Sequence, residues 1–169
     1  MASTLELDLL TPLDWRMLRA ARLYALLDSP DAFTSSYADE SAWSQLDWHR
    51  SLNAATWIVA REAQNVIGLA KIVSEPALPA SRYVESAWVA PTHRRRGVLR
   101  TLLEGLAEIS RRMGVTELML WVLEDNYAAD NAYRALGFEP TGDRQFLSDF
   151  GQYERQLRRE LGKREIFGP

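Results

Sequence analysis

The chain has 169 residues and is 47% hydrophobic, so it can form one compact domain with a sizeable core, which we expect over residues 1–169. Its 20 basic and 23 acidic residues give a formal net charge of −3, which argues against nucleic acid as a partner, because duplex binding uses a spread positive surface. The lack of cysteine excludes disulfides, thiolate metal ligands and a cysteine nucleophile.

Targeting signals and metal ligands are not evident in the sequence pattern. Residues 1–8 lack a basic stretch and a long apolar run, and no later segment has the roughly 18 uncharged apolar residues of a membrane helix. We therefore expect a cytoplasmic protein with no membrane partner. His49 and His93 are too isolated for a metal site, which needs three or four converging ligands.

The first third of the chain predicts one short strand and two helices. Residues 5–10 alternate loosely as a strand, and Thr11-Pro12 then starts a helix that should run to about Leu27. A second helix is expected over residues 39–52, after a loop rich in aromatic and hydroxyl side chains.

The middle of the chain predicts a hairpin and then a strand, helix, strand crossover. Residues 56–61 and 66–73 are β-rich and lie on either side of a short polar turn, which favours antiparallel pairing. Residues 82–90 form the next strand, and the helix between Gly97 and Gly114 carries one apolar stripe. Residues 117–123 are almost continuously apolar, as in a strand covered on both faces, so we expect them to pair in parallel with the preceding strand.

The last part of the chain predicts a short helix and two strands. The helix is expected over residues 127–136, closed by Gly137. A strand at Phe138, a polar loop over residues 142–151 and a final strand near residues 152–161 follow.

An arginine-rich turn stands between the strand over residues 82–90 and the helix after it. A helix start has backbone N–H groups without partners and the positive end of the helix dipole, so a phosphate gains hydrogen bonds and charge there. Arg94, Arg95, Arg96 and Arg100 add positive charge around this turn. The pattern predicts a phosphate-sized binding site, and a solvated basic turn is the alternative.

Two sequence blocks resemble the GNAT superfamily of acyl-CoA-dependent N-acyltransferases. The first, Trp88-Val89-Ala90-Pro91 followed by Arg94-Arg95-Arg96-Gly97-Val98-Leu99, is similar to the family's pyrophosphate loop, written Gln or Arg, any, any, Gly, any, Gly or Ala. The other block is similar to the family pattern V-x-x-x-N-x-x-A-x-x-x-Y-x-x-x-G-F, with its positions filled by Val122, Asn126, Ala129, Tyr133, Gly137 and Phe138.

This resemblance implies an α/β (α+β) GNAT fold. Such a fold has a mixed central sheet of about six to seven strands, flanked by about four helices, and a central pair of parallel strands that splays. It also implies acetyl-CoA as co-substrate. The residues expected to contact it are Trp88, Val89, Ala90, Arg94, Arg95, Arg96, Gly97, Val98, Leu99, Arg100, Asn126 and Ala129. Leu99 departs from the pattern, because the family loop usually has Gly or Ala there, and its side chain could crowd the diphosphate.

The resemblance also implies catalytic roles. Tyr133 would protonate the departing thiolate, Glu85 would act as general base, and a backbone N–H near Val89 would receive the developing oxyanion. Asn126 and Tyr133 are seven residues apart, so both can project from the same helix face. From the residues alone, a core tyrosine, a helix-capping asparagine and a surface carboxylate remain alternatives.

The acceptor residues are predicted from two segments that commonly line the family's acceptor cleft. The first is the loop between the two N-terminal helices, with Phe33, Ser35, Ser36 and Tyr37, and the second lies near the last hairpin, with Arg144, Gln145, Phe146 and Tyr153. Ordinary packing or surface exposure is the alternative for each. We single out Phe33, Tyr37, Arg144 and Tyr153 as substrate-binding residues.

The function favoured by these features is N-acetyl transfer from acetyl-CoA to a primary amine of a small molecule or a peptide, by direct attack in a ternary complex. A non-catalytic acyl-CoA-binding or sensor module on the same fold is the alternative. A nucleotide hydrolase is excluded, because Gly97 is not followed by Lys-Ser or Lys-Thr. A last strand that pairs with a second copy would give a homodimer.

Overall fold

Seven strands and five α-helices form the part of the chain that the computed structural model describes, residues 5–162. The strands are β1 (Leu5–Leu9), β2 (Thr56–Glu62), β3 (Asn65–Ser74), β4 (Ser81–Val89), β5 (Glu117–Leu123), β6 (Glu139–Leu147) and β7 (Gln152–Glu160). The helices are α1 (Trp15–Asp28), α2 (Tyr37–Ser41), α3 (Gln45–Ala54), α4 (Val98–Arg112) and α5 (Tyr127–Ala135). Short 3-10 turns cover Pro12–Asp14, Pro30–Ala32 and Pro91–His93.

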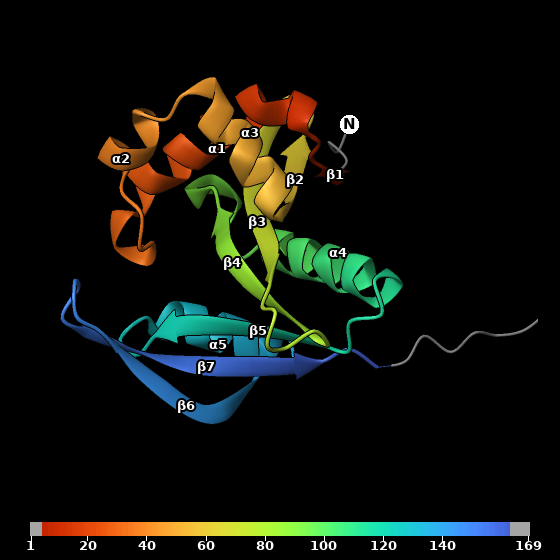
Figure 1. Cartoon of the computed structure of the whole chain (residues 1–169), viewed down its shortest axis with the longest axis vertical. Helices are drawn as coiled ribbons and strands as arrows, with labels where there is room; N and C mark the ends of the chain where they lie inside the picture. The colour runs from red at the N-terminus through yellow and green to blue at the C-terminus, as the bar shows by residue number, and fades with distance from the viewer. Residues whose placement is uncertain (1–4, 163–169) are drawn as a thin grey trace, which may run out of the picture. The chain divides into compact units, whose positions relative to one another are not determined.

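The strands belong to one mixed sheet in the order β1-β2-β3-β4-β5-β7-β6 (Figure 1). This architecture confirms the predicted α/β fold and its mixed sheet. The chain divides into two compact units, of which the first contains residues 1–73 and 86–106 and the second residues 74–85 and 107–169. Strand β4 and helix α4 each contribute to both units. A single functional domain over the whole chain remains a prediction.

The first unit is built on the antiparallel strands β1, β2 and β3. Their register pairs Leu7 with Ala60 and Val59 with Leu69, and the last three of these side chains are fully buried. The hairpin predicted over residues 56–73 is therefore confirmed. Helices α1 and α3 contact each other in this unit.

Two glycines let the first half of α4 lie close to these strands. A Cβ added to Gly68 on β3 would lie 3.0 Å from side-chain atoms of both Val98 and Leu102. A Cβ on Gly105 of α4 would lie 2.8 Å from Leu7 Cδ1. A Cβ at either position would force its neighbours to shift, so the two glycines allow the start of α4 to pack closely in the first unit.

The second unit contains the parallel pair and the C-terminal hairpin. Strand β4 pairs in parallel with β5 through Ser81 and Glu117, Arg82 and Leu118, and Tyr83 and Met119. Strand β5 also pairs antiparallel with β7, and β7 with β6. The predicted crossover from β4 through α4 to β5 is thus confirmed.

Strand β4 has an irregular backbone at Ser86, whose φ is 57°. A residue other than glycine rarely adopts this left-handed conformation, and a single such residue in a strand acts like a bulge that redirects it. The irregularity follows Tyr83, the last residue of β4 in the parallel register, by three positions. It separates the part of β4 that pairs with β5 from the part that leads into the arginine-rich turn.

The helix predicted over residues 39–52 is wrong, because the structure has two helices there, α2 and α3. Helix α2 ends at Ser41, and Ser44 is the N-cap of α3. Its Oγ accepts a hydrogen bond from the Asp47 N–H at 3.3 Å, and the Asp47 carboxylate accepts one from the Ser44 N–H at 2.9 Å. This reciprocal capping box satisfies the free donors of a new helix start, so a second helix begins at Gln45.

The polar loop predicted over residues 142–151 is also wrong for most of its length. Strand β6 continues to Leu147, and Phe146 pairs with Tyr153 across the hairpin. The register shifts between Pro140 and Arg144, which marks a bulge. Almost all side chains of β6 are exposed, so the strand lacks the apolar alternation by which strands are recognised in a sequence.

Within residues 5–162, the helices are all too short or too polar to traverse a lipid bilayer.

Candidate active site

The turn between β4 and α4 exposes a helix start. Arg95 and Gly97 have φ values of 60° and 84°, both in the left-handed region, and Gly97 has no other atom within 4 Å of the place where a Cβ would stand. The Gly97 carbonyl accepts the first α4 hydrogen bond, from the Thr101 N–H at 3.0 Å. The N–H groups of the first turn of α4 have no acceptor within the helix, and successive backbone N–H groups in such turns form a concave anion site.

The four arginines of this turn and of the start of α4 are exposed. The side chains of Arg95, Arg96 and Arg100 reach solvent, and Arg96 Nη2 lies 3.8 Å from Glu62 Oε1. At that distance on the surface, such an ion pair holds its partners weakly. These guanidinium groups therefore supply positive charge next to the open N-terminus of α4.

Arg94 differs from its neighbours because the protein itself binds its side chain. Its Nε donates to the Val89 carbonyl at 2.9 Å, and its Nη2 donates to Asp28 and to Ser29 Oγ, the latter at 3.2 Å. Asp28 also accepts from Trp88 Nε1 at 2.8 Å. The turn is thereby joined to the C-terminal end of α1.

A second contact holds the same turn from its other side. His93 Nε2 lies 3.0 Å from Glu62 Oε2, and His93 Nδ1 lies 2.9 Å from Thr92 Oγ1. Glu62 ends strand β2, so the turn is tied to β2 and to α1 at once. This fixes the loop before any ligand arrives.

The two residues that follow Gly97 point differently. Val98 is buried against Gly68, whereas Leu99, the position that departs from the family pattern, is half-buried. Trp88 and Ala90 are buried too, and the Trp88 ring meets Tyr24 edge to face with 5.3 Å between centroids. The Trp88 side chain is therefore part of the core. A ligand beside this stretch of the chain would contact backbone N–H and C=O groups and not these two side chains.

Helix α5 places the second predicted block. Asn126 is its N-cap, with Oδ1 accepting from the Ala129 N–H at 3.1 Å. At the other end, Gly137 has a φ of 86°, and the Phe138 N–H donates to the Tyr133 carbonyl at 3.1 Å. Burial raises the pKa of Tyr133 to about 12, so its phenol keeps its proton at neutral pH.

Glu85, the predicted base, has an exposed side chain on β4 and immediately precedes the irregular residue Ser86. The structure places it in the same unit as Tyr133, whereas Val89 belongs to the other unit.

The predicted acceptor residues fall into two groups. Phe33 packs under the Arg22 guanidinium, 4.6 Å from the ring centroid, and Tyr37 is exposed at the start of α2. In the second unit, the Arg144 guanidinium stacks 3.6 Å from the centroid of the exposed Tyr153 ring. Arg144 and Tyr153 are therefore in contact in the second unit. Phe33 and Tyr37 belong to the first unit.

Arg144 is also held by a carboxylate. Its Nε and Nη2 donate to the two oxygens of Glu124 at 2.6 and 2.7 Å, and these hydrogen bonds lower the pKa of Glu124. Glu124 directly follows β5, so the hairpin of β6 and β7 is fastened to the end of that strand.

The comparison with known families decides the identity of the chain. Residues 21–138 match the profile described as the Acetyltransferase (GNAT) family. The chain belongs to the GNAT acetyltransferase family. It is accordingly an acyltransferase, and this family generally uses acetyl-CoA as co-substrate.

Individual relatives agree with this assignment. Over 95 residues the chain is 34% identical to an L-2,4-diaminobutyric acid acetyltransferase of Streptomyces coelicolor, and the match spans 55% of each protein, about half the length of that curated relative. The solved structure of a GNAT-family acetyltransferase from Streptococcus pneumoniae superposes with a TM-score of 0.77 at 17% identity, covering 94% of this chain and 100% of that one. A ribosomal-protein-alanine N-acetyltransferase from Brucella melitensis gives 0.72 at 24% identity, covering 92% and 99%.

Sequence reasoning missed the partners of three side chains in or beside the predicted site. Asp28 and Ser29 bind Arg94, Glu62 binds His93, and Glu124 binds Arg144. In the sequence, Asp28 and Ser29 indicate only a helix end, and each contact joins residues at least 20 positions apart. No local pattern signals such distant pairs.

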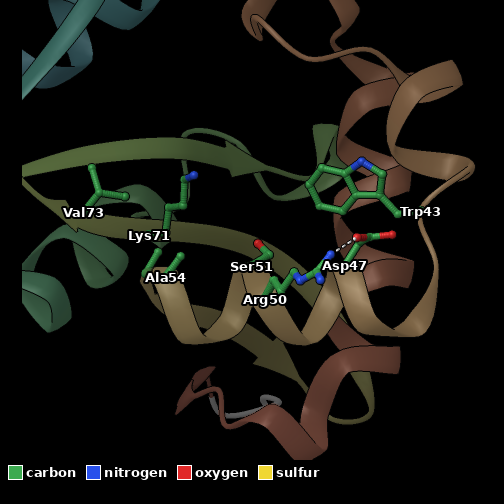
Figure 2. A pocket seen from close by; sticks show the side chains of 8 residues that line it. Trp43, Asp47, Arg50, Ser51, Ala54, Lys71 and Val73 are labelled. Atoms are coloured by element: carbon green, nitrogen blue, oxygen red, sulfur yellow. Dashed lines mark hydrogen bonds and ion pairs between the residues drawn. The ribbon is translucent and has the colours of Figure 1, made fainter.

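A separate pocket of about 460 Å³ opens beside α3 and β3 (Figure 2). Its lining residues are Trp43, Asp47, Arg50, Ser51, Ala54, Ala55, Lys71 and Val73. Arg50 donates to Asp47 at 3.2 Å, as Figure 2 shows, and the Lys71 ammonium lies 5.2 Å from the Trp57 ring centroid. None of the residues predicted for the GNAT site lines this pocket.

Clusters of three or more His, Asp or Glu side chains able to hold a metal ion do not occur within residues 5–162.

Proposed function

We propose that this GNAT acetyltransferase moves the acetyl group of acetyl-CoA to a primary amine by direct attack in a ternary complex. The observation that carries the proposal is the exposed start of α4, which follows two left-handed residues, Arg95 and Gly97, and is surrounded by exposed arginines. A diphosphate is the group whose charge and acceptor oxygens match these donors.

The residues present fit the diphosphate of acetyl-CoA. The N–H groups of Val98, Leu99 and Arg100 belong to the first turn of α4, and Gly97 leaves the approach to them open. Leu99 is half-buried along the helix, so part of its side chain packs on the protein. Backbone donation does not depend on the residue type, and this supports cofactor binding in spite of the leucine.

The chemistry requires few groups besides the bound thioester. The amine nitrogen attacks the thioester carbonyl carbon, a C–N bond forms, and the C–S bond breaks as the thiolate leaves. We assign protonation of the thiolate to Tyr133, whose phenol is neutral. Glu85, directly or through water, is assigned removal of a proton from the substrate ammonium, which frees the lone pair with which the amine nitrogen attacks. The N–H of Val89 would receive the charge that develops on the carbonyl oxygen.

Direct transfer is preferred to a covalent acyl-enzyme. The sequence has no cysteine to carry the acetyl group. We therefore expect both substrates to bind before the first product leaves, and we expect no burst of CoA from the enzyme in the absence of amine.

The acceptor is proposed to be a primary amine of a small molecule or of a peptide. The named relatives fit this range, since one is a diaminobutyric acid acetyltransferase and another a ribosomal-protein-alanine N-acetyltransferase. Phe33 and Tyr37 on one segment and Arg144 and Tyr153 on the other are proposed to contact it. The aromatic rings of Phe33, Tyr37 and Tyr153 suit the carbon chain of an amine, and an ammonium can lie against an aromatic face.

An amine panel tests the proposed function. The protein is incubated with acetyl-CoA and, one at a time, with diamines, amino acids, polyamines and short peptides, and free CoA thiol is measured. Amine-dependent thiol release together with an acetylated amine in the mass spectrum is the expected result. Tight binding of acetyl-CoA without turnover on any amine would instead identify a non-catalytic acyl-CoA-binding module.

A further inference from the structure

Three hydrogen-bond donors meet at the carboxylate of Asp28, the last residue of α1. Asp28 Oδ2 accepts hydrogen bonds from Trp88 Nε1 at 2.8 Å, from Ser29 Oγ at 2.7 Å and from Arg94 Nη2. Arg94 Nη2 also lies 3.2 Å from Ser29 Oγ. The Asp28 side chain is 14% exposed, whereas the Arg94 side chain is 47% exposed, so the carboxylate is the sheltered member of this cluster.

From this cluster, Arg94 reaches back to the strand that precedes it. Its Nε donates to the Val89 carbonyl at 2.9 Å. The other end of the same peptide group, the Ala90 N–H, donates to the Ile67 carbonyl on β3 at 2.8 Å. The Val89–Ala90 peptide plane is therefore held on both sides, by Arg94 and by β3.

We propose that Arg94 is a positioning residue of the acetyl-transfer site, which orients the Val89 backbone and ties it to Asp28, rather than a ligand of the diphosphate. The Nε and one Nη of its guanidinium already have protein acceptors. Exposure does not separate Arg94, whose side chain is 47% exposed, from its exposed neighbours. The difference is the set of hydrogen bonds that holds Arg94, whereas the side chains of Arg95, Arg96 and Arg100 can turn towards a phosphate. The inference rests on the proposed function, because the expected oxyanion donor is the Val89 N–H, which belongs to the peptide group directly before the one that Arg94 holds.

The cluster keeps its charges over the working pH range. Burial of Asp28 opposes ionisation, but the hydrogen bonds from Ser29 and Trp88 and the charge of Arg94 outweigh it and hold the pKa of this carboxyl below its usual value. Asp28 thus stays anionic well below neutral pH and continues to hold Arg94. A guanidinium suits this role because its fixed fork serves two acceptors at once, which the single ammonium of a lysine does not.

Asp28 also begins the segment that carries the acceptor candidates Phe33 and Tyr37. A disturbance of Asp28 should therefore reach the acetyl-transfer site through Arg94, although the two residues are 66 positions apart. The expected signature is a loss of turnover with little loss of acetyl-CoA affinity, because the donors at the start of α4 are untouched.

A double-mutant cycle tests this role. Arg94→Gln and Asp28→Asn should each lower kcat roughly tenfold to a hundredfold, since small displacements at a reacting centre cost that much, and the double variant should lose no more than the worse single one. Arg96→Gln is the matched comparison on the same turn. It should raise the KM for acetyl-CoA instead, and its effect should add to that of Asp28→Asn.

Two further readouts separate the outcomes. Arg94→Lys keeps the charge and should not restore kcat, whereas a phosphate ligand would be partly rescued by lysine. The NMR signal of the Trp88 indole N–H should shift in Asp28→Asn and Arg94→Gln but not in Arg96→Gln, in the absence of acetyl-CoA.

One set of results would overturn the proposal. In it, Arg94→Gln raises the KM for acetyl-CoA, Arg94→Lys restores that KM, and the effect of Arg94→Gln adds to that of Asp28→Asn. A wild-type protein that releases no CoA with any amine would instead refute the proposed function and leave the indole shifts as the test of the cluster.

Discussion

Tyr133 and Phe138 meet edge to face, with 5.8 Å between their ring centroids, where α5 ends. Phe138 is buried and anchors the tyrosine ring from one side. Replacement of Tyr133 by Phe keeps this packing and removes only the hydroxyl. We expect the variant to lose roughly a hundredfold in kcat, as is usual when a general acid is deleted, while the Kd for acetyl-CoA stays within about twofold.

The exposed Tyr127 provides the control for this measurement, because it lies on the same helix and 71% of its surface is open to solvent. Tyr127→Phe should have the kcat of the wild type in the same CoA-release assay. Equal turnover of Tyr133→Phe and Tyr127→Phe would remove Tyr133 from the mechanism.

The raised pKa of the Tyr133 phenol should be measurable in an alkaline titration. Burial raises the pKa of Tyr133 from 10.0 to about 12, so the group keeps its proton after ordinary tyrosines have ionised. Between these two pH values the unfolded chain loses this proton and the folded chain does not, so the contribution of Tyr133 to stability falls as pH rises. Tyrosinate absorbance should contain one late step that disappears in Tyr133→Phe. Identical late titration in both proteins would contradict the burial of the hydroxyl.

Gly97 and Gly114 offer a matched pair at the two ends of α4. Both have positive φ, 84° and 76°, and at both a Cβ would meet nothing within 4 Å. Substitution by Ala should therefore cost each variant about 1 kcal/mol of unfolding free energy, through backbone strain alone.

Only the Gly97→Ala variant should lose cofactor affinity. Hydrogen bonds to a charged group contribute about 1.5–3 kcal/mol each, so misplacing one N–H at the start of α4 should raise the Kd for acetyl-CoA at least about tenfold. Calorimetric titration of both variants checks this difference. The same Kd for both would show that the diphosphate is bound elsewhere.

The buried ion pair of Arg22 and Glu40 should dominate the stability of the first unit. Arg22 Nη2 lies 2.8 Å from Glu40 Oε1, and the two side chains are 6% and 4% exposed. Arg22→Met leaves the glutamate charge buried without its partner and should cost about 3–5 kcal/mol in urea unfolding. The double variant Arg22→Met, Glu40→Leu should recover most of this loss.

The surface pair of Arg50 and Asp47 gives the comparison, since its side chains are 69% and 39% exposed. Arg50→Met should cost less than about 1 kcal/mol. A similar loss for both pairs would mean that Arg22 and Glu40 are accessible to water in solution.

Much of the fold could be predicted because its signals are local. The apolar run over residues 117–123 and the stripe of α4 identified the crossover, and Gly97 marked the helix start. The start of α3 was not predicted, although the sequence carries its signal, because Ser44 and Asp47 have the spacing of a capping box. The length of β6 was not, because its side chains are exposed on both faces and so show no apolar alternation.

The candidate site was predicted as a set of positions but not as a set of contacts. The spacing from Asn126 to Phe138 predicted a short helix closed by Gly137, and α5 has this form. Asn126 caps the helix, which was the alternative to its predicted cofactor contact, and that contact stays a prediction. The partner of Arg94 could not be found in this way, because Asp28 lies 66 residues earlier and only the packing of α1 beside β4 brings it near. A run of three arginines gives no indication of which one the protein itself holds.

Calorimetric titration with acetyl-CoA and with S-acetylpantetheine, which lacks the diphosphate, tests the central claim most directly. The start of α4 should bind acetyl-CoA at a single site, and the truncated thioester should bind at least about a hundredfold more weakly, because it cannot use the backbone donors or the charges of Arg95, Arg96 and Arg100. Equal affinity for the two compounds, or no heat with acetyl-CoA, would contradict the account.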